Sequence, residues 1–350
     1  MPQKNPPIMV SFDPDAAAQP GSGIFGLPST EDDAAVVLVP VPYDATTSYR
    51  RGAAGGPSLI VEASHQVDLY DRETGRPYLH GIFCRPESTE VRGWNDQARQ
   101  AADPVLEAAG VIDGDPALEA SLALVNEISE RVDEHVYREV NGLLARGKVV
   151  GLIGGDHSTP FGSIRAHAER WPGLGVLHID AHADLRDAFE GFTRSHASIM
   201  HNVMTRIPGV GRLVQVGIRD FGERELAFIE ASGGRIRTHF DVDIFQLKFQ
   251  GQSFAQIADR IVDDLPGEVY VSFDIDGLDP AFCPGTGTPV PGGFHFHEVS
   301  YLLGQVVRSG RRIVGFDLNE VAPGPNEDEW NGIVGARMLY KLIGWALHGR

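Results

Sequence analysis

A chain of 350 residues with 42% hydrophobic and 22% charged residues has the composition of an ordinary globular protein, which excludes a disordered or fibrous chain. The formal net charge of -18 argues against a nucleic-acid partner, because binding a phosphate backbone requires Lys and Arg concentrated on one face. A small cationic substrate would suit this negative charge better. Only two cysteines are present, Cys84 and Cys283, which excludes a disulfide framework or a thiolate metal site and predicts a reducing compartment, the cytoplasm.

The beginning of the chain has no basic stretch followed by an apolar run, and nowhere does the sequence approach ~18 uninterrupted apolar residues. We therefore expect neither a signal peptide nor a membrane partner. Residues 1–33 are rich in Pro and Gly with few apolar clusters, which predicts an irregular N-terminal arm. The remainder contains no internal repeat and no Gly- or Ser-rich linker, so residues 34–350 are predicted to form a single α/β domain.

Short apolar runs rich in β-branched or aromatic residues recur after this arm, and they lack the strict alternation of half-exposed strands. The predicted strands are residues 36–41, 149–153, 175–179, 213–218, 269–273 and 313–318. Helical patterns lie between them, at residues 116–146, 163–170, 223–231, 254–264, 296–308 and 334–347. Strands that alternate with helices predict a three-layer α/β/α sandwich with a mostly parallel sheet.

His and Asp are concentrated where three of these predicted strands end. Parallel sheets place their functional sites at the carboxyl ends of the strands, so these segments are the candidates for chemistry. They read Gly-Gly-Asp-His-Ser at 154–158, Asp-Ala-His-Ala-Asp at 180–184 and Asp-Ile-Asp at 274–276.

The spacing of these residues predicts a metal site. Extended backbone sends alternate residues to the same side, so Asp180, His182 and Asp184 can converge, and Asp274 and Asp276 can do so from another strand. Carboxylates gathered beyond apolar strands repel one another unless cations neutralise them, and imidazole with carboxylate is a ligand set for first-row divalent metals. Each motif alone also fits a turn or a helix cap, but their joint occurrence at three strand ends favours metal.

Together with two further motifs, these segments resemble the ureohydrolases, the family of arginase, agmatinase, guanidinobutyrase and formimidoylglutamase. The resemblance runs from about Val36 to the C-terminus, and an early Pro-Tyr-Asp at 42–44 resembles agmatinase more than arginase. The motifs are Gly-Gly-Asp-His-Ser at 154–158, Asp-Ala-His-Ala-Asp at 180–184, Ser-Phe-Asp-Ile-Asp-Gly-Leu-Asp-Pro at 272–280, Gly-Thr-Gly-Thr-Pro at 285–289 and Asn-Glu-Val-Ala-Pro at 319–323.

The resemblance implies two divalent metal ions per chain, with manganese as the usual metal of the family and nickel as the alternative. A hydroxide bridging the ions would attack the guanidinium carbon, and Asp184 would also orient it. The implied ligands are His157 and His182, one for each ion, with Asp180, Asp184, Asp274 and Asp276 completing and bridging the pair.

Three further residues are implied to act on the substrate. His196 matches the histidine that shuttles a proton to the leaving amine, and Glu320 matches the acid that holds the guanidinium group. By themselves they would be taken for a loop histidine and a structural carboxylate. Trp330 ends a stretch, 324–330, that resembles an agmatinase-like branch acting on guanidine, and it would either close a small pocket over a cation or pack the C-terminal helix.

The expected substrate is therefore agmatine, free guanidine, an alkyl-guanidine or a biguanide, cleaved to urea and an amine or ammonia. Arg186 and Gly222 stand where arginase has an amide and an acid, which argues against an α-amino acid. The alternatives are a deacetylase-like amidohydrolase with one metal ion and a non-catalytic paralogue. The resemblance also implies a homo-oligomer, a trimer or hexamer, alone or with a paralogous subunit.

Overall fold

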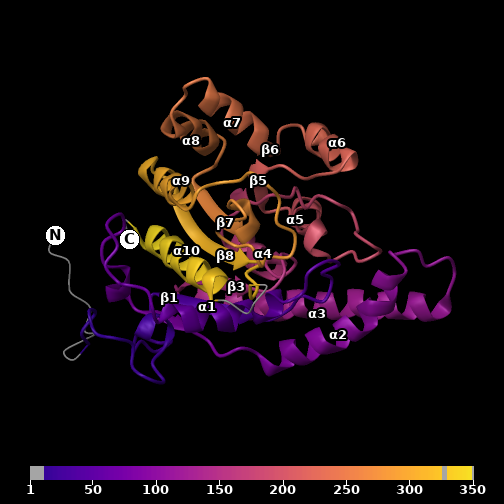
Figure 1. Ribbon diagram of the computed structural model, residues 1–350, viewed down its shortest axis with the longest axis horizontal. Coiled ribbons are helices and arrows are strands. Elements are labelled where there is room, and N and C mark those ends of the chain that lie inside the picture. The colour runs from indigo at the N-terminus through magenta and orange to yellow at the C-terminus, as the bar shows by residue number, and fades with distance from the viewer. Residues whose placement is uncertain (1–11, 325–328, 349–350) are drawn as a thin grey trace.

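The structure, a computed structural model, describes residues 12–324 and 329–348 (Figure 1). In these ranges eight strands form one sheet in the order β2-β1-β3-β8-β7-β4-β5-β6, and every neighbouring pair is parallel. The strands are β1 (Val36–Val41), β2 (Ile82–Cys84), β3 (Val149–Gly154), β4 (Leu174–Ile179), β5 (Val210–Ile218), β6 (Ile236–Phe240), β7 (Glu268–Asp274) and β8 (Arg312–Asn319).

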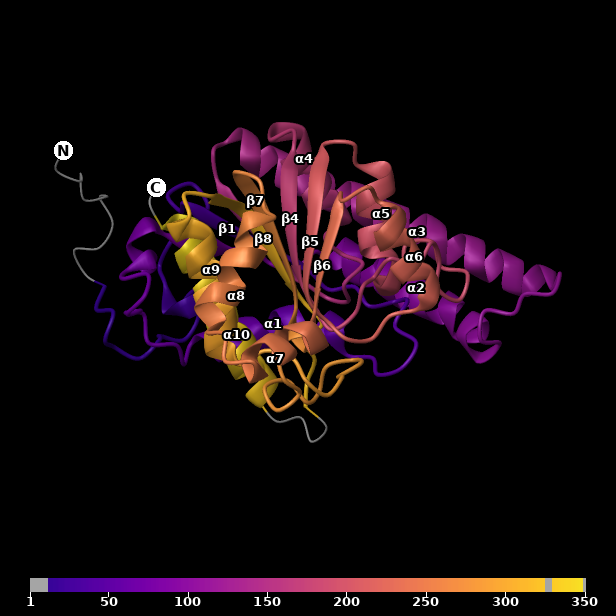
Figure 2. The ribbon, with the colours of Figure 1, turned by 90° about the horizontal axis from the view of Figure 1, so that it is seen from above.

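Helices cover both faces of this sheet, as Figure 2 shows, so the predicted three-layer α/β/α sandwich is confirmed. Helices α2, α3, α4 and α5 pack on one face, and α1, α8, α9 and α10 pack on the other. The helices are α1 (Gly56–Ser64), α2 (Thr89–Glu107), α3 (Pro116–Ala145), α4 (Phe161–Arg170), α5 (Ile199–Arg206), α6 (Glu223–Ala231), α7 (Asp241–Phe249), α8 (Phe254–Asp263), α9 (Phe296–Arg308) and α10 (Trp330–Leu347).

The sheet is buried on both faces, which explains why its strands lack polar alternation. In β1, Val36 and Leu38 belong to the core shared with α1, α9 and α10, whereas Val37 and Val39 belong to the core shared with α2 and α3. All six residues of β1, β3 and β4 are buried. Burial of an apolar side chain at every position of such a strand stabilises the fold, which favours a continuous apolar sequence.

The six predicted strands and the six predicted helices are all present, with ends that shift by a few residues. The sequence patterns did not predict the two edge strands, β2 and β6, or the helices α1, α2, α5 and α7. Helices α2 and α3 pack against each other and project together beyond the body of the molecule (Figure 1). The predicted start of α3 is correct, because the side chain of Asp115 accepts a hydrogen bond from the Ala117 N–H at 2.8 Å.

The described part of the N-terminal arm packs on the body of the protein. Its one short helical turn, Ile24–Gly26, buries Ile24 and Phe25. The Phe25 N–H donates to the Ser64 Oγ of α1 at 2.9 Å, and the Phe25 ring lies 4.9 Å from the Tyr340 ring of α10. Residues 1–11 of the predicted arm lie outside the described residues.

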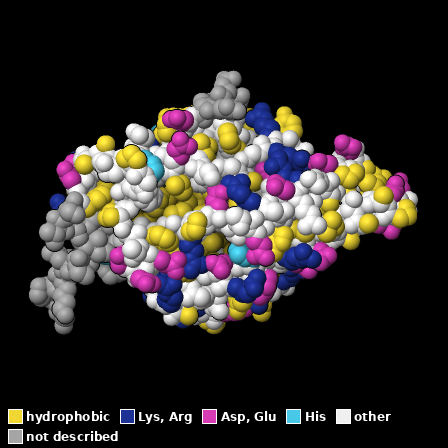
Figure 3. Space-filling model, turned by 90° about the horizontal axis from the view of Figure 1, so that it is seen from below, with side chains coloured by type: hydrophobic (Ala, Val, Ile, Leu, Met, Phe, Trp, Pro, Cys, Tyr) yellow, Lys and Arg dark blue, Asp and Glu magenta, His cyan; other side chains and the backbone are white. Residues whose placement is uncertain are grey.

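One face of the described chain is mixed in charge. On the face in Figure 3, basic and acidic side chains are interspersed among apolar ones, so the basic residues described there do not gather into one broad field. No described helix combines the length and apolar character needed to cross a lipid bilayer.

Candidate metal centre

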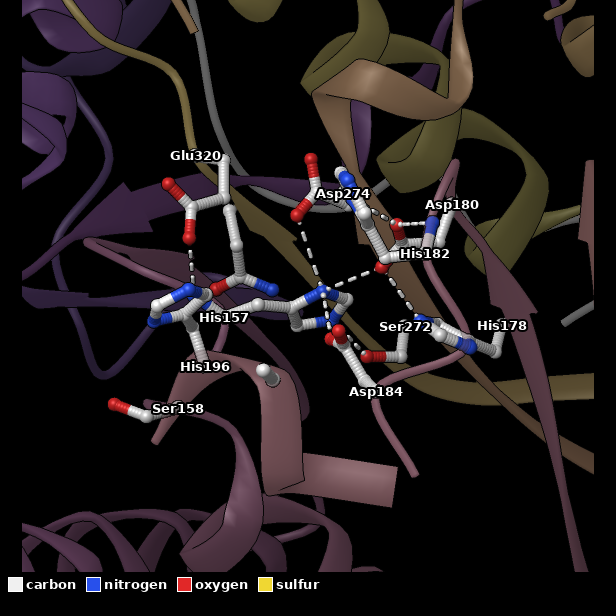
Figure 4. A network of polar contacts seen from close by, with 12 residues as sticks. His157, Ser158, His178, Asp180, His182, Asp184, His196, Ser272, Asp274 and Glu320 are labelled. Carbon is white, nitrogen blue, oxygen red and sulfur yellow. Dashed lines mark hydrogen bonds and ion pairs between the residues drawn. The ribbon is translucent and has the colours of Figure 1, made fainter. Parts of the chain in front are cut away.

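The carboxyl ends of four adjacent strands, β3, β8, β7 and β4, bring the predicted site residues together (Figure 4). His157 follows β3, Asp180 follows β4, Asp274 ends β7 and Glu320 follows β8. Parallel pairing places all four strand ends on one edge of the sheet. Residues separated by as many as 163 positions along the chain therefore come into hydrogen-bond contact.

His157 lies at the centre of the first half of this site. Its side chain is buried, and its Nδ1 is 2.9 Å from Asp180 Oδ2, 3.2 Å from Asp274 Oδ2 and 3.5 Å from Asp184 Oδ2. Three carboxylates thus surround one imidazole nitrogen. Carboxylate oxygens and an imidazole nitrogen this close to one point can bind one divalent cation.

His182 forms the second half. Its Nδ1 is 3.0 Å from Asp276 Oδ2 and 3.5 Å from Asp180 Oδ1. Asp180 therefore directs one carboxylate oxygen toward His157 and the other toward His182, which is the arrangement of a carboxylate that bridges two ions. We call the six predicted ligands the His–Asp cluster; they are His157, Asp180, His182, Asp184, Asp274 and Asp276.

Local backbone features position these side chains. Asp184 adopts a positive φ of 54°, which turns the chain after Asp180 and His182 so that its carboxylate faces His157. Gly155 allows the loop after β3 to pass directly over Tyr43, because a Cβ added at Gly155 would lie 1.9 Å from the Tyr43 carbonyl oxygen. The second glycine of the Gly-Gly-Asp-His-Ser motif is thus required by packing.

The hydrogen bond of His157 Nε2 determines which ring nitrogen of His157 carries the proton. The Ser272 hydroxyl donates to Asp317 Oδ1 at 3.0 Å, so its oxygen is free to accept from His157 Nε2–H at 2.9 Å. A neutral His157 ring then has its Nδ1 lone pair directed at three carboxylates. Such an arrangement is repulsive by itself and favourable around a cation, so the residues present fit a bound metal ion.

The pKa shifts of the cluster residues agree with a bound metal ion. Burial raises the pKa of Asp184 and Asp274 well above its usual value, and neighbouring carboxylates add to the effect. Burial opposes protonation of His157 and His182, yet the surrounding carboxylates raise the pKa of both rings well above the usual value. Without metal, protons would offset the negative charge; divalent cations can replace them.

Glu320 lies beside the cluster with one carboxylate oxygen already engaged. Its Oε1 accepts from the backbone N–H of His157 at 2.9 Å, and its own backbone has a positive φ of 61°. Its carbonyl oxygen accepts from Thr286 Oγ1 at 2.9 Å, which ties it to the loop after β7. Burial raises the pKa of Glu320, and the charges of Asp274 and Asp156 reinforce the effect. The second oxygen, Oε2, is available to a ligand.

His196 lies near the cluster on the short helical turn His196–Ser198 (Figure 4). Its Nδ1 is 3.5 Å from Thr46 Oγ1, and Thr46 Oγ1 donates to the buried carboxylate of Asp156 at 3.2 Å. Burial lowers the pKa of His196 to about 4, and the charges of His182 and His157 act in the same direction. The ring is therefore neutral at pH 7.

Trp330 is not part of this buried group. It begins α10, is 46% exposed, and its indole N–H donates to the Ala281 carbonyl at 3.0 Å. Ala281 belongs to the loop that follows the Asp274–Asp276 segment. Most of the stretch before Trp330, residues 325–328, lies outside the described residues.

The Arginase family model matches residues 34–344. The chain belongs to the arginase family. An N(1)-aminopropylagmatine ureohydrolase of Synechocystis sp. is 32% identical over 320 residues, which cover 89% of each chain. An agmatinase of Klebsiella pneumoniae is 31% identical and the match covers 89% of this chain and 88% of that one. Among solved structures, proclavaminate amidinohydrolase from Streptomyces clavuligerus has a TM-score of 0.70 at 26% identity, covering 96% of this chain and 100% of that chain.

This member of the arginase family is accordingly a hydrolase that acts on amidino C–N bonds. Its His and Asp side chains, buried except for the partly exposed His182, form two groups that share Asp180, which fits a site for two metal ions.

Sequence reasoning missed a set of polar residues inside the sheet. They occupy one register across five neighbouring strands, so their side chains form a continuous line. Two of them stand two residues before Asp180 and Asp274, so the line lies directly beneath the cluster. All except Thr238 interrupt an apolar strand, a signal that the sequence carries, but their alignment depends on strand order. We call them the polar row: Thr238 of β6, Gln215 of β5, His178 of β4, Ser272 of β7 and Asp317 of β8.

Proposed function

We propose that the chain hydrolyses a small guanidino compound to urea and an amine or ammonia, with two divalent metal ions bound by the His–Asp cluster. One observation carries the proposal: Asp180 lies within 2.9 Å of His157 and within 3.5 Å of His182 through different oxygens. Mn²⁺ is the proposed metal because carboxylates dominate the site, and Ni²⁺ is the alternative because the general affinity order favours it.

Charge supports two ions rather than one. The cluster contains four carboxylates and two imidazoles, so two divalent cations would balance four negative charges. A deacetylase-like site with one ion would leave His182 and Asp276, which are 3.0 Å apart, without a function. We therefore propose that His157 and Asp184 would hold one ion, that His182 and Asp276 would hold the other, and that Asp180 and Asp274 would contact both.

Bound divalent ions would supply a water molecule with a lowered pKa, so that it is nucleophilic at neutral pH. Glu320 Oε2 accepts N–H groups of the guanidinium and holds its carbon over the cluster, since Oε1 is fixed by the His157 N–H. Asp184 accepts a hydrogen bond from the nucleophile and orients it. His196, neutral at pH 7, takes up a proton and delivers it to the leaving nitrogen.

The proposed substrates are compact guanidino compounds without an α-amino acid group. Two similar proteins are named for agmatine and N(1)-aminopropylagmatine, which supports agmatine as the first candidate. Guanidine, alkyl-guanidines and biguanides are the other candidates. For them we propose that Trp330, which contacts the loop at Ala281, narrows the entrance and contacts the substrate.

The decisive test is a urea-release assay on the purified chain loaded separately with Mn²⁺ and Ni²⁺. Agmatine, N(1)-aminopropylagmatine, guanidinobutyrate, guanidine, dimethylguanidine and metformin form the substrate panel. We expect urea from at least one compound and a loss of at least about 100-fold in Asp180→Asn, which removes the shared carboxylate charge. Metal analysis should give about two ions per parent chain. The absence of urea from every compound with either metal would overturn the proposal.

We further propose that the protein acts in the cytoplasm as a homo-oligomer, a trimer or hexamer, alone or with a paralogous subunit, and that residues 34–350 are one domain behind the N-terminal arm. Light scattering of the purified chain measures the oligomeric state. An inactive chain that gains activity only when a second protein is added would indicate the paralogous arrangement.

A further inference from the structure

His178 is the member of the polar row that touches the His–Asp cluster most closely. Its side chain is fully buried in β4, and its Nε2 is 2.7 Å from Asp180 Oδ2. Proximity alone would make it a candidate metal ligand together with His157, Asp180 and Asp184. Its hydrogen bond with Gln215 indicates a different role.

The orientation of the Gln215 amide is fixed by its neighbours. Ala183 O, which can only accept, lies 2.7 Å from Gln215 Nε2, so this atom must be the nitrogen. On the opposite side, the Thr238 hydroxyl donates to Gln215 Oε1 at 3.0 Å. The remaining N–H of the amide faces His178 Nδ1 at 3.0 Å.

It follows that His178 Nδ1 accepts a hydrogen bond and that a neutral ring carries its proton on Nε2. This proton lies between Nε2 and Asp180 Oδ2. Both ring nitrogens are therefore engaged, and neither presents a lone pair to an ion. Asp180 Oδ1 has a comparable donor, because it accepts from the His182 backbone N–H at 2.6 Å. One donor on each oxygen leaves each with a lone pair for one half of the cluster.

We propose that His178 is a positioning residue whose Nε2–H holds the shared carboxylate of Asp180, and that Gln215 and Thr238 lock the ring in the tautomer that can donate. The inference rests on the proposed two-metal function. Loss of the donor frees Asp180 Oδ2, the oxygen that faces His157, so binding of the ion on the His157 side should weaken most.

The test compares His178→Phe with His178→Gln. Both leave the Gln215 N–H without the imidazole acceptor, but only glutamine can place an N–H near the position of Nε2. We expect Mn²⁺ affinity, titrated against a chelator in the absence of substrate, to fall about 10–100-fold for one of the two ions in His178→Phe. His178→Gln should stay within about threefold of the parent. The histidine–carboxylate pair His239–Asp264, which shares no residue with the cluster, provides the control His239→Phe, with unchanged affinity for both ions.

Two outcomes overturn the inference: His178→Phe binding both ions as tightly as the parent, or His178→Gln losing as much affinity as His178→Phe. If His178→Phe does not fold, as judged by circular dichroism, Gln215→Leu tests the tautomer lock. That variant should weaken one Mn²⁺ site several-fold, and parental affinity would contradict the lock. Because metal affinity is measured without a substrate, a wrong proposal about guanidino hydrolysis would appear in the urea assay and leave this result interpretable.

Discussion

Glu320 combines three features that are each uncommon for a carboxylate. Its φ is 61°, its side chain is buried, and one oxygen is fixed by the backbone N–H of His157. These features support the proposal that Glu320, held in a strained backbone conformation and away from water, orients a ligand with its second oxygen. Its neighbour Thr286 donates to its carbonyl oxygen and stabilises this conformation.

Glu320→Gln should separate substrate binding from metal binding. The amide oxygen can still accept from the His157 N–H, but the second oxygen is replaced by an NH₂ group that repels the N–H groups of a guanidinium. We expect kcat/KM for the best substrate to fall about 100-fold while the metal content stays at the parental value. Glu298→Gln is the control, because Glu298 on α9 contacts residues outside the cluster: it forms an ion pair with Lys248 and accepts a hydrogen bond from the His295 N–H. A Glu320→Gln enzyme with parental kcat/KM would exclude the proposed contact.

The residues that could be predicted from the sequence are those whose types repeat at strand ends. His157, Asp180 and Asp274 follow apolar runs directly, so parallel strands bring them together by topology alone. The polar row could not be assigned, because Gln215, His178 and Ser272 become neighbours only once strand order and register are known. The role of Trp330 depends on a loop contact that no periodicity encodes.

At the scale of elements, central strands were predictable and peripheral elements were not. Burial on both faces gives the central strands a continuous apolar signature. The edge strand β2 has three residues, and β6 reads Ile-Arg-Thr-His-Phe with only its first residue buried. Helix α2 contains Pro104, is polar on average and buries mostly small residues, so it lacks the large apolar side chains that mark the predicted helices. Its contact with α3 stabilises it, which is tertiary packing overriding local propensity.

An ion-pair network joins the segment before β1 to the end of α3 and the residue after β2. Glu31 accepts from Arg85 Nε at 2.7 Å and from Arg85 Nη2 at 2.9 Å, and it also contacts Arg146, the C-cap of α3. The Arg85 and Arg146 guanidinium groups hold the pKa of Glu31 at about 2, against a usual value of 4.5. A lowered pKa in the folded state means that the ionised form stabilises the fold.

Glu31→Gln should therefore lower the free energy of unfolding in a pH-dependent way. We expect a loss of about 1–2 kcal/mol at pH 7, less than the full linkage because the Glu31 side chain is 24% exposed. The difference from the parent should shrink as the pH falls from 4.5 towards 2, where Glu31 becomes protonated in the parent as well. Urea unfolding followed by circular dichroism from pH 7 to pH 3.5 measures it.

Asp32→Asn is the matched control for this network. Asp32 pairs with the same Arg146 at 2.7 Å, but its side chain is 95% exposed. An exposed pair of this kind contributes little, so its loss should change stability by less than about 0.5 kcal/mol. A Glu31→Gln effect that is equally large at every pH would assign the loss to packing instead of charge.

For the whole molecule, metal binding and stability should be coupled. The His–Asp cluster joins segments that follow β3, β4 and β7, so ions bound there would connect the centre of the sheet and remove repulsion between buried carboxylates. Ions that bind the folded chain and not the unfolded one stabilise it by about 2.7 kcal/mol per site at 100 times Kd. Removal of the metal should lower the free energy of unfolding by a corresponding amount.

We expect chelation with EDTA followed by dialysis to lower Tm by roughly 5 °C or more, and re-addition of Mn²⁺ or Ni²⁺ to restore it. Differential scanning calorimetry of the apo, reloaded and Asp180→Asn proteins measures the effect. The Asp180→Asn protein should respond much less to added metal. Identical Tm values for the apo and reloaded parent would contradict coupling between the cluster and the fold.

The uniform direction of the strands has one more consequence. Every strand ends on the same rim, so the proposed ion ligands lie in the first residues past the strands, whereas residues further along belong to longer connections such as 279–284. Exchanging or lengthening such a connection is expected to change which compounds reach the cluster while its ligands stay in place. On the proposed function, substrate selection and metal binding are thus carried by separable stretches of chain, and each can change while the other is preserved.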